Sequence, residues 1–158
     1  MRRIDLLSIV IPCHNEEEVL PTTHKRLSKI LNSLLSIKRI SKYELVYVDN
    51  GSTDNTLLVL KDIFASDPHT RIIALRRNFG FQGSISAGMF YAKGDAVVTI
   101  DADLQDPPEK IEEMITYFEQ GYDLVLGVRT DRSNDSFIKR FLSENYYRLM
   151  RLMGVNIV

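Results

Sequence analysis

Features that would place the chain in several familiar classes of protein are missing from its sequence. There is one cysteine, Cys13, so an internal disulfide is impossible and a reducing compartment is expected. No segment reaches the roughly 18 to 20 apolar residues that span a bilayer, and the N-terminal residues do not resemble a signal peptide. The net charge is −1, so the whole molecule is not expected to bind nucleic acid. Any affinity for anions must come from local groups of side chains.

Two glycine-rich phosphate-binding signatures are also absent. No G-x-G-x-x-G follows an expected strand, and no G-x-x-x-x-G-K-[ST] occurs anywhere, so neither the usual dinucleotide site nor a P-loop is predicted. The glycines within LRRNFGFQGSISAG, residues 75–88, are interpreted instead as a flexible turn and a close helix contact. Cys13 borders an apolar run, which favours a buried, inert thiol over a nucleophile.

Apolar runs rich in β-forming residues alternate with segments of helical periodicity. With 158 residues, 44% of them hydrophobic, the chain is long enough for one domain, residues 1–158, with a sizeable core. The alternation predicts an α/β fold, a Rossmann-like three-layer sandwich with a mainly parallel sheet. The expected strands are 6–12, 43–49, 70–76, 95–101 and 123–129, and the expected helices are 16–37, 55–66, 83–93, 108–121 and 136–154.

Polar and acidic residues gather where four of these strands end. The sequences are PCHNEE after the first strand, DNGSTD after the second, DADLQD after the fourth and GVRTDR after the fifth. Parallel α/β sheets bind their ligands outside the carboxyl ends of the strands. The functional site is therefore predicted at this edge of the sheet.

The stretch DADLQD has the composition of a metal site. Strand periodicity places Asp101 and Asp103 on the same side, with the small Ala102 between them. Two carboxylates so placed suit Mg²⁺ or Mn²⁺, which keep coordination positions for the phosphate oxygens of a substrate. Gln105 could add a neutral oxygen. The alternative interpretation is a solvated turn that leads into a helix.

The residues that follow fit the start of that helix. Asp106 is a candidate N-cap, with Pro107 at the first helical position. Glu109 then stands at the third position, as in a capping box. On this interpretation these three residues need no catalytic role.

The turns after the first two strands have a structural and a functional interpretation. Asp49 stands at a strand tip and could accept hydrogen bonds from a nucleobase or ribose, whereas Ser52 or Thr53 is expected to cap the next helix. Glu16 favours a helix N-terminus and could also bind a ribose hydroxyl.

Residues 129–151 carry six basic and three acidic side chains, a local charge of +3. Arg140, Glu144, Arg148 and Arg151 share one stripe of the expected helix. The stripe is either a solvated face or a basic face for the phosphate of a lipid or for an anionic bilayer.

In this order, SIVIPCHNEE, VDNGSTDNT, RNFGFQGSISAG, DADLQDPPE and GVRTDR resemble the family 2 glycosyltransferases of GT-A fold. The polyprenyl-phosphate group, which includes dolichol-phosphate mannose synthase and bactoprenol glucosyltransferase, is the most similar. The resemblance implies a nucleotide-diphospho-sugar transferase fold and a Mg²⁺ or Mn²⁺ cofactor. It also implies inverting transfer of a hexose to undecaprenyl or dolichyl phosphate at the cytoplasmic face of the membrane. The favoured donor is a UDP-hexose such as UDP-glucose, with GDP-mannose as the alternative, and self-association is left open.

The resemblance also gives roles to individual residues. Pro12, His14, Glu16 and Asp49 would hold the nucleoside, while Asp101 and Ala102 would line the nucleotide. Asp103 and Gln105 would bind the metal, and Asp103 and Arg129 would be catalytic, with Arg129 facing a donor or acceptor phosphate. Lys139 and Ser143, within KRFLS, would bind the acceptor phosphate.

Three departures from the family pattern bear on these roles. Asn50 stands where the family usually has a second acid, and His14 stands where tyrosine is common. The family also continues further, with acceptor-side and membrane elements, so a chain truncated at its C-terminus is expected. Two alternatives are a glycosyltransferase acting on a saccharide hydroxyl in polysaccharide synthesis and a non-catalytic nucleotide- or metal-binding α/β module.

Overall fold

The structure is a computed structural model that describes residues 2–128. Residues up to Val125 form one compact unit, and Leu126 begins a second unit that lies mostly outside the described residues. Strands and helices alternate along the first unit, as the sequence pattern predicts. Its elements are β1 (Ile4–Cys13), α1 (Leu20–Ser36), β2 (Ile40–Asp49), α2 (Thr56–Ser66), β3 (Thr70–Ala74), α3 (Gly80–Tyr91), β4 (Ala96–Thr99) and α4 (Lys110–Glu119).

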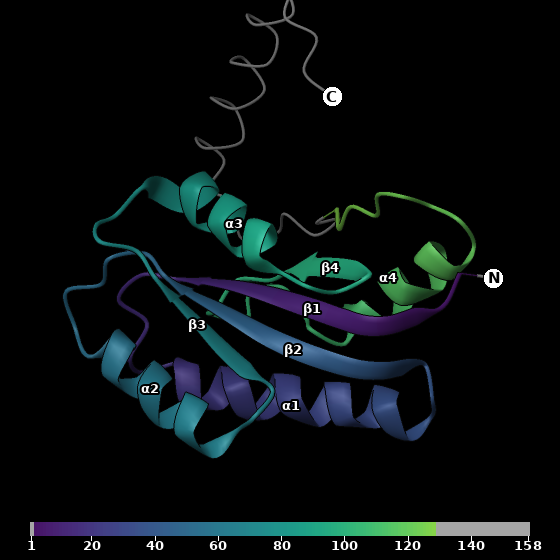
Figure 1. The fold of residues 1–158 in the computed structure, drawn as a ribbon, viewed down its shortest axis with the longest axis horizontal. Coiled ribbons are helices and arrows are strands. Elements are labelled where there is room, and N and C mark those ends of the chain that lie inside the picture. The colour runs from purple at the N-terminus through teal and green to yellow at the C-terminus, as the bar shows by residue number, and fades with distance from the viewer. Residues whose placement is uncertain (1, 129–158) are drawn as a thin grey trace, which may run out of the picture. The chain divides into compact units, whose positions relative to one another are not determined.

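The four strands form one sheet in the order β3-β2-β1-β4, and all three pairings are parallel. Helices α1 and α2 cover one face and α3 covers the other (Figure 1). Ile111 and Ile115 of α4 belong to the same core cluster as the apolar side chains of α1. The predicted parallel sheet between two layers of helices is therefore confirmed.

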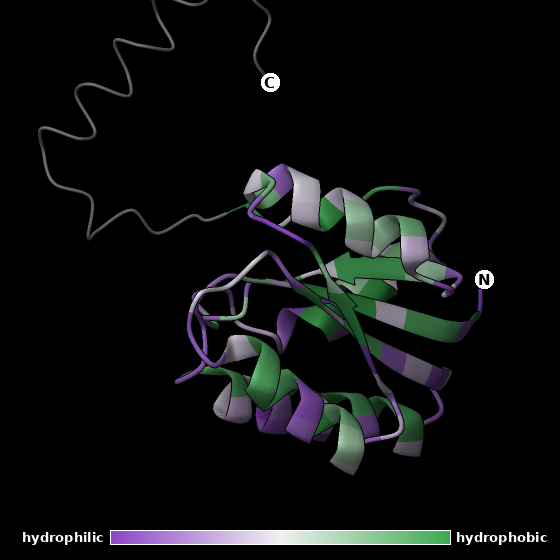
Figure 2. Ribbon diagram, turned by 60° about the vertical axis from the view of Figure 1, so that its left-hand side comes forward, coloured by the Kyte–Doolittle hydropathy of each residue, from purple (hydrophilic) through white to green (hydrophobic). Residues whose placement is uncertain are grey.

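The central strands β1 and β2 are buried on both faces. Ile9 and Tyr47 pack in the cluster on the α1 and α2 side, whereas Val10 and Val48 pack in the cluster on the α3 side. This alternation follows from the two-residue periodicity of a strand. In Figure 2 the strands are largely hydrophobic, while the loops that leave them are mostly hydrophilic.

Helix α3 lies close to the sheet because it presents a glycine to it. A Cβ atom built on Gly88 would overlap Val10 Cγ1 and would lie 3.0 Å from Val48 Cγ2. Both valines are fully buried, so neither has free space to move into. The predicted close helix contact of the segment 75–88 is thus made at Gly88.

The register of the sheet brings the strand ends to one edge. Cys13 pairs with Asp49, and Asp49 pairs with Ala74. On the other side of β1, Val10 pairs with Thr99, and the Ile100 N–H donates to Val10 O over 3.0 Å. The polar segments that follow β1, β2, β3 and β4 therefore start at nearly the same level.

The predicted strand at 123–129 is not formed in residues 123–128. Leu124, Leu126 and Val128 are 73%, 72% and 80% exposed, so their side chains are not buried as those of the central strands are. Apolar alternation gives a segment β-propensity, but a strand also requires a partner. The expected helix 136–154 lies outside the described residues.

The capping box predicted at Asp106–Glu109 is also wrong. Helix α4 starts at Lys110, and its N-cap residue, Glu109, makes no side-chain cap hydrogen bond. The Glu109 carboxylate instead accepts hydrogen bonds of 2.8 Å from the Arg26 guanidinium of α1. A local signal was thus overridden by a contact between helices. No helix within residues 2–128 is long and apolar enough to cross a membrane.

The contact at Gly88 leads to a prediction about stability. Gly88→Val should lower the free energy of unfolding by about 1–3 kcal/mol, because the added atoms must displace buried valines. Urea unfolding of the purified chain measures this change. Ser86→Ala, on the exposed side of the same helix, is the matched control and should change stability by no more than about 0.5 kcal/mol. Equal stability of the unaltered chain and the Gly88→Val variant would contradict the contact.

Candidate functional site

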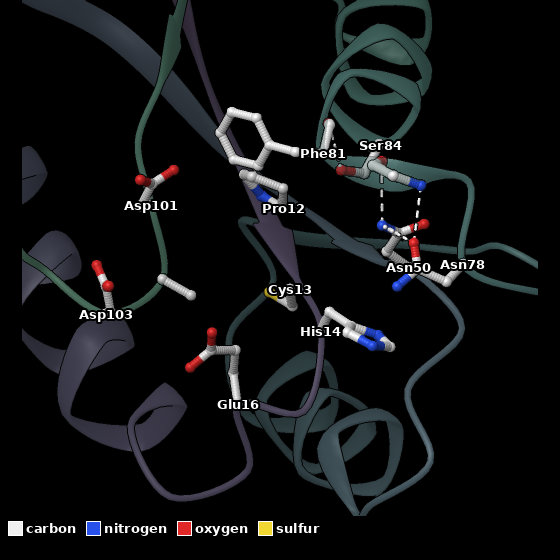
Figure 3. Close-up of a pocket in the computed structure, with 12 residues that line it drawn as sticks. Pro12, Cys13, His14, Glu16, Asn50, Asn78, Phe81, Ser84, Asp101 and Asp103 are labelled. Atoms are coloured by element: carbon white, nitrogen blue, oxygen red, sulfur yellow. Dashed lines mark hydrogen bonds between the residues drawn. The ribbon is translucent and has the colours of Figure 1, made fainter. Parts of the chain in front are cut away.

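A pocket of about 330 Å³ opens at the carboxyl edge of the sheet. Figure 3 shows its two sides, with the carboxylates of Glu16, Asp101 and Asp103 on one and the Asn50–Asn78 pair on the other. The lining comes from the ends of β1 and β2, the start of α3 and the segment after β4. The residues that line it are Pro12, Cys13, His14, Glu16, Asn50, Asn78, Gly80, Phe81, Ser84, Asp101, Ala102 and Asp103.

The acidic side is held in place by α1 and by its own turn. The Thr23 hydroxyl of α1 donates to Ala102 O over 2.5 Å, in a buried contact. The Gln105 N–H donates to Asp103 Oδ1 over 3.0 Å, and Leu104 between them has a left-handed φ of 56°. The Asp103 carboxylate is therefore oriented by a tight turn that fixes one of its oxygens.

The loops after β1 and β2 bind each other. The Asn15 N–H donates to Ser52 Oγ over 3.1 Å, and Asn15 Oδ1 accepts from the Thr53 N–H over 2.8 Å. The Glu16 N–H donates to Thr56 Oγ1 over 2.7 Å. The hydroxyls of Ser52 and Thr53, which were expected to cap α2, thus bind Asn15 instead. The N-cap residue of α2 is Asn55, which makes no side-chain cap bond. Glu16 is thereby fixed beside the acidic segment.

The electrostatics of the acidic side favour a cation. Burial and the nearby carboxylates of Asp103, Asp54 and Asp101 raise the pKa of Glu16, and His14 opposes them. Among the described residues, the lining of the pocket contains no lysine or arginine. Without a bound cation, the negative charge of these carboxylates is therefore energetically unfavourable.

A divalent cation at this site would share its coordination between the protein and a ligand. Within residues 2–128, no group of three histidine, cysteine or acidic side chains could hold a metal ion. Magnesium-type sites often use one or two carboxylates and complete their coordination with substrate phosphates. The acidic side fits that kind of site and does not fit a closed protein cage.

The opposite side of the pocket is neutral. The Asn50 amide is hydrogen bonded to the residues at the start of α3, and the Ser84 hydroxyl donates to Phe81 O over 2.7 Å. Phe81 is 53% exposed and Pro12 lies beside it in Figure 3, so an apolar surface separates the acidic and amide sides. The acidic side would suit an anionic part of a ligand only together with a divalent cation, and the amide side would suit a flat, polar heterocyclic part.

The structure places the sequence-predicted residues in three groups. Asp49 is 3% exposed and accepts the Ser52 N–H, and it does not line the pocket. Gln105 is exposed and does not line it either. Arg129, Lys139 and Ser143 lie outside the described residues. The predicted residues that line the pocket are Pro12, His14, Glu16, Asp101, Ala102 and Asp103.

The sequence gives no site role to the other six lining residues, which are Cys13, Asn50, Asn78, Gly80, Phe81 and Ser84. The signal was available, because RNFG follows the third strand as PCHNEE follows the first. The composition of segment 75–88 indicates only a turn and a packing contact, and the family resemblance gives no site role to its residues. The prediction for Cys13 is confirmed, since the thiol is 2% exposed and burial raises its pKa well above the usual range.

Comparison with known proteins gives related sequences of bacterial and phage origin. A Bacillus subtilis protein described as uncharacterized glycosyltransferase YkcC is 44% identical over 143 residues, which cover 90% of this chain and 43% of the relative. The undecaprenyl-phosphate 4-deoxy-4-formamido-L-arabinose transferase of Pectobacterium atrosepticum is 42% identical, covering 92% and 43%. The bactoprenol glucosyl transferase of Shigella phage SfV is 37% identical, covering 90% and 45%. The chain thus spans less than half the length of these curated relatives.

Solved structures share the fold at lower identity. Residues 1–349 of S. aureus TarS superpose with a TM-score of 0.58 at 19% identity, over 78% of this chain and 38% of that one. The mannosyltransferase PcManGT from Pyrobaculum calidifontis, in complex with GDP-Man and Mn²⁺, gives a TM-score of 0.57 at 21% identity, over 80% and 34%. These likenesses support the GT-A fold.

The model of glycosyl transferase family 2 matches residues 8–156, which is nearly the whole chain. The expected family is therefore confirmed, and this chain belongs to glycosyl transferase family 2.

Proposed function

We propose that this chain forms the nucleotide-sugar-binding part of a metal-dependent glycosyltransferase that passes a hexose to a polyprenyl phosphate. The observation that carries the proposal is the pocket, which sets Glu16, Asp101 and Asp103 opposite a neutral amide side. The names of two relatives, an undecaprenyl-phosphate transferase and a bactoprenol glucosyl transferase, support the lipid phosphate acceptor.

The donor's two halves match the two sides of the pocket. The diphosphate would lie along the acidic side, where Asp103, with Gln105 near it, would hold Mg²⁺ or Mn²⁺. When bound, the cation stabilises the negative charge that develops on the leaving nucleotide. Asp101 and Ala102 line the nucleotide, and the nucleoside lies against Pro12 and His14.

The preferred donor is a UDP-hexose, with GDP-mannose as the alternative. UDP, UDP-GlcNAc and GDP-Man each accompany one of the solved structures that share this fold, so the fold accommodates both nucleotides. The choice between them stays a prediction from the sequence resemblance.

The acceptor explains why no general base is assigned. A phosphate monoester has a second pKa near 6, so it is largely a dianion at neutral pH. One of its oxygens attacks the anomeric carbon, the bond from that carbon to the donor diphosphate breaks, and the electron pair leaves with the diphosphate. Attack from the opposite side inverts the anomeric centre. Positioning and electrostatics then supply most of the catalysis.

The acceptor side belongs to residues outside the described part. Arg129, Lys139 and Ser143 stay predictions for the phosphate groups, as does the place of action at the cytoplasmic face of the membrane. A saccharide hydroxyl acceptor would require a catalytic base in addition. Incubation with a radiolabelled UDP-hexose separates the two acceptors, since label enters the organic phase only with undecaprenyl phosphate.

Nucleotide binding is the first prediction of this proposal. Calorimetry with UDP and with GDP should detect binding of one of them in the presence of Mn²⁺, and weaker binding after chelation. UDP is expected to bind more tightly than GDP. Binding of Mn²⁺ alone, with no effect of either nucleotide, would instead favour the non-catalytic metal-binding module.

The role of Asp103 gives the second prediction. Asp103→Asn should weaken Mn²⁺-dependent nucleotide binding by at least about tenfold, because a neutral amide replaces a charged ligand. Metal-free nucleotide binding should change little. The matched control is Asp62→Asn, which removes the same charge from the exposed face of α2. Unchanged metal dependence in Asp103→Asn would contradict the assignment.

Glu16 gives a prediction about stability and pH. Its raised pKa means that the folded chain binds this proton more readily than the unfolded chain, so stability falls as the pH rises above the ordinary value of 4.5. Glu16→Gln should therefore raise the melting temperature near pH 7, and the gain should vanish near pH 4. The exposed Glu18→Gln is the control. A gain of equal size at both pH values would show that Glu16 is not strained by its neighbours.

A further inference from the structure

The side chain of Asn50 binds three consecutive residues of another loop. Asn50 Nδ2 donates to Asn78 Oδ1 over 3.2 Å and to Gly80 O over 3.1 Å. Asn50 Oδ1 accepts the Phe79 N–H over 2.9 Å. The orientation of the amide is not ambiguous, because Phe79 offers only a donor and the Gly80 carbonyl only an acceptor. Both N–H groups of the Asn50 amide are therefore used within the protein.

This contact fixes the loop that begins α3. Asn78 Oδ1 also accepts the Gly80 N–H over 2.7 Å, so the Asn50 and Asn78 amides form one network (Figure 3). The anchor itself is firm, since Asn50 is 4% exposed and its backbone N–H donates to Cys13 O over 2.8 Å. Asn78, Gly80 and the following Phe81 all line the pocket.

The turn that carries Asn50 packs directly on the backbone of the same loop. Gly51 has a left-handed φ of 65°, and a Cβ atom built there would overlap the backbone of Arg77 and would lie 2.7 Å from Asn78 N. Only glycine satisfies both the conformation and the space. The turn after β2 and the loop before α3 are therefore in direct backbone contact.

We propose that Asn50 is a positioning residue that holds the Asn78–Phe81 side of the pocket through its amide and thereby sets nucleotide affinity. The inference rests on the proposed function, since it takes the pocket as the nucleotide site. It explains why this chain carries an amide at a position where the sequence resemblance leads to an acid. An ionised carboxylate could still accept the Phe79 N–H, but it has no hydrogen to donate to Asn78 Oδ1 or Gly80 O.

Asn50→Asp tests this point because its effect depends on protonation. Near pH 8 the introduced carboxylate faces two acceptor oxygens, and nucleotide affinity should fall at least about tenfold. Burial and these oxygens raise the pKa of the introduced group. Acidification to about pH 5.5 should then return a proton that bonds one of the oxygens and restore part of the affinity.

The measurement is calorimetry with UDP plus Mn²⁺ and with GDP plus Mn²⁺. The result is expressed as the nucleotide affinity of the variant divided by that of the unaltered protein at each pH. The titratable or charged side chains around position 50 are Asp49 on its strand, Cys13 and His14 at the end of β1, Arg77 in the facing loop and the three carboxylates across the pocket. They are present in both proteins, so the ratio removes their direct contribution. A ratio that does not change with pH would overturn the proposal.

Two further variants keep the test decisive. Asn55→Asp adds the same charge at an exposed position beside α2, and its affinity ratio should stay near one at both pH values. Asn50→Ala removes the three bonds without adding charge, so affinity should fall with no recovery in acid. Thermal unfolding tests whether Asn50→Asp folds. If it does not fold, Asn50→Ala takes its place in the experiment.

Hydrogen exchange separates this proposal from the proposed function. The Phe79 amide proton should exchange at least about tenfold faster in Asn50→Ala than in the unaltered protein, with or without nucleotide. Unchanged exchange would overturn the anchoring role. If the unaltered protein binds neither UDP nor GDP, the proposed function fails. If the unaltered protein binds UDP or GDP, but with the same affinity as Asn50→Asp at pH 8, the proposed role of Asn50 in affinity fails.

Discussion

The pairing of β1 with β2 is the constraint on which the rest of the structure depends. Both strands are buried on both faces, so their middle residues can only be apolar or internally hydrogen bonded. Within β2, Glu44 is buried only because Ser8 and Arg71 bind it, so carboxylates that face the pocket lie where the strands end. The register aligns Cys13 with Asp49, which sets the two following loops side by side and lets them bind each other. The pocket is a consequence of this alignment.

The two sides of the pocket are stabilised in different ways. The neutral side satisfies its polar groups internally, through the amides of Asn50 and Asn78. The acidic side holds Glu16 near Asp101 and Asp103 although its pKa is raised there, so this arrangement opposes folding in the absence of a cation. Like charges brought together at this cost are characteristic of functional sites. The same carboxylates therefore account both for the raised pKa of Glu16 and for the preference of this side for a cation.

Much of the fold could be predicted because its signals are local. Alternating periodicities located β1 to β4 and α1 to α4, and the strand-end rule located Glu16, Asp101 and Asp103. The failures were contacts between distant segments. Glu109 binds Arg26, 83 residues away, instead of capping its own helix. The strand expected at 123–129 required a partner, and the role of Asn50 depends on Asn78, 28 residues further along the chain. Periodicity carries no information about such pairs.

Position 50 and the loop before α3 are joined by the hydrogen bonds of one amide. The Asn50 amide can hold Asn78 and Gly80 only while both present oxygens to it. A chain with an acid at this position would need donors in that loop, and so a different backbone course or different side chains there. An acid would also add a fourth carboxylate to a pocket whose lining, within residues 2–128, has no lysine or arginine. The amide therefore leaves the acidic side as the main source of charge in the described lining of the pocket.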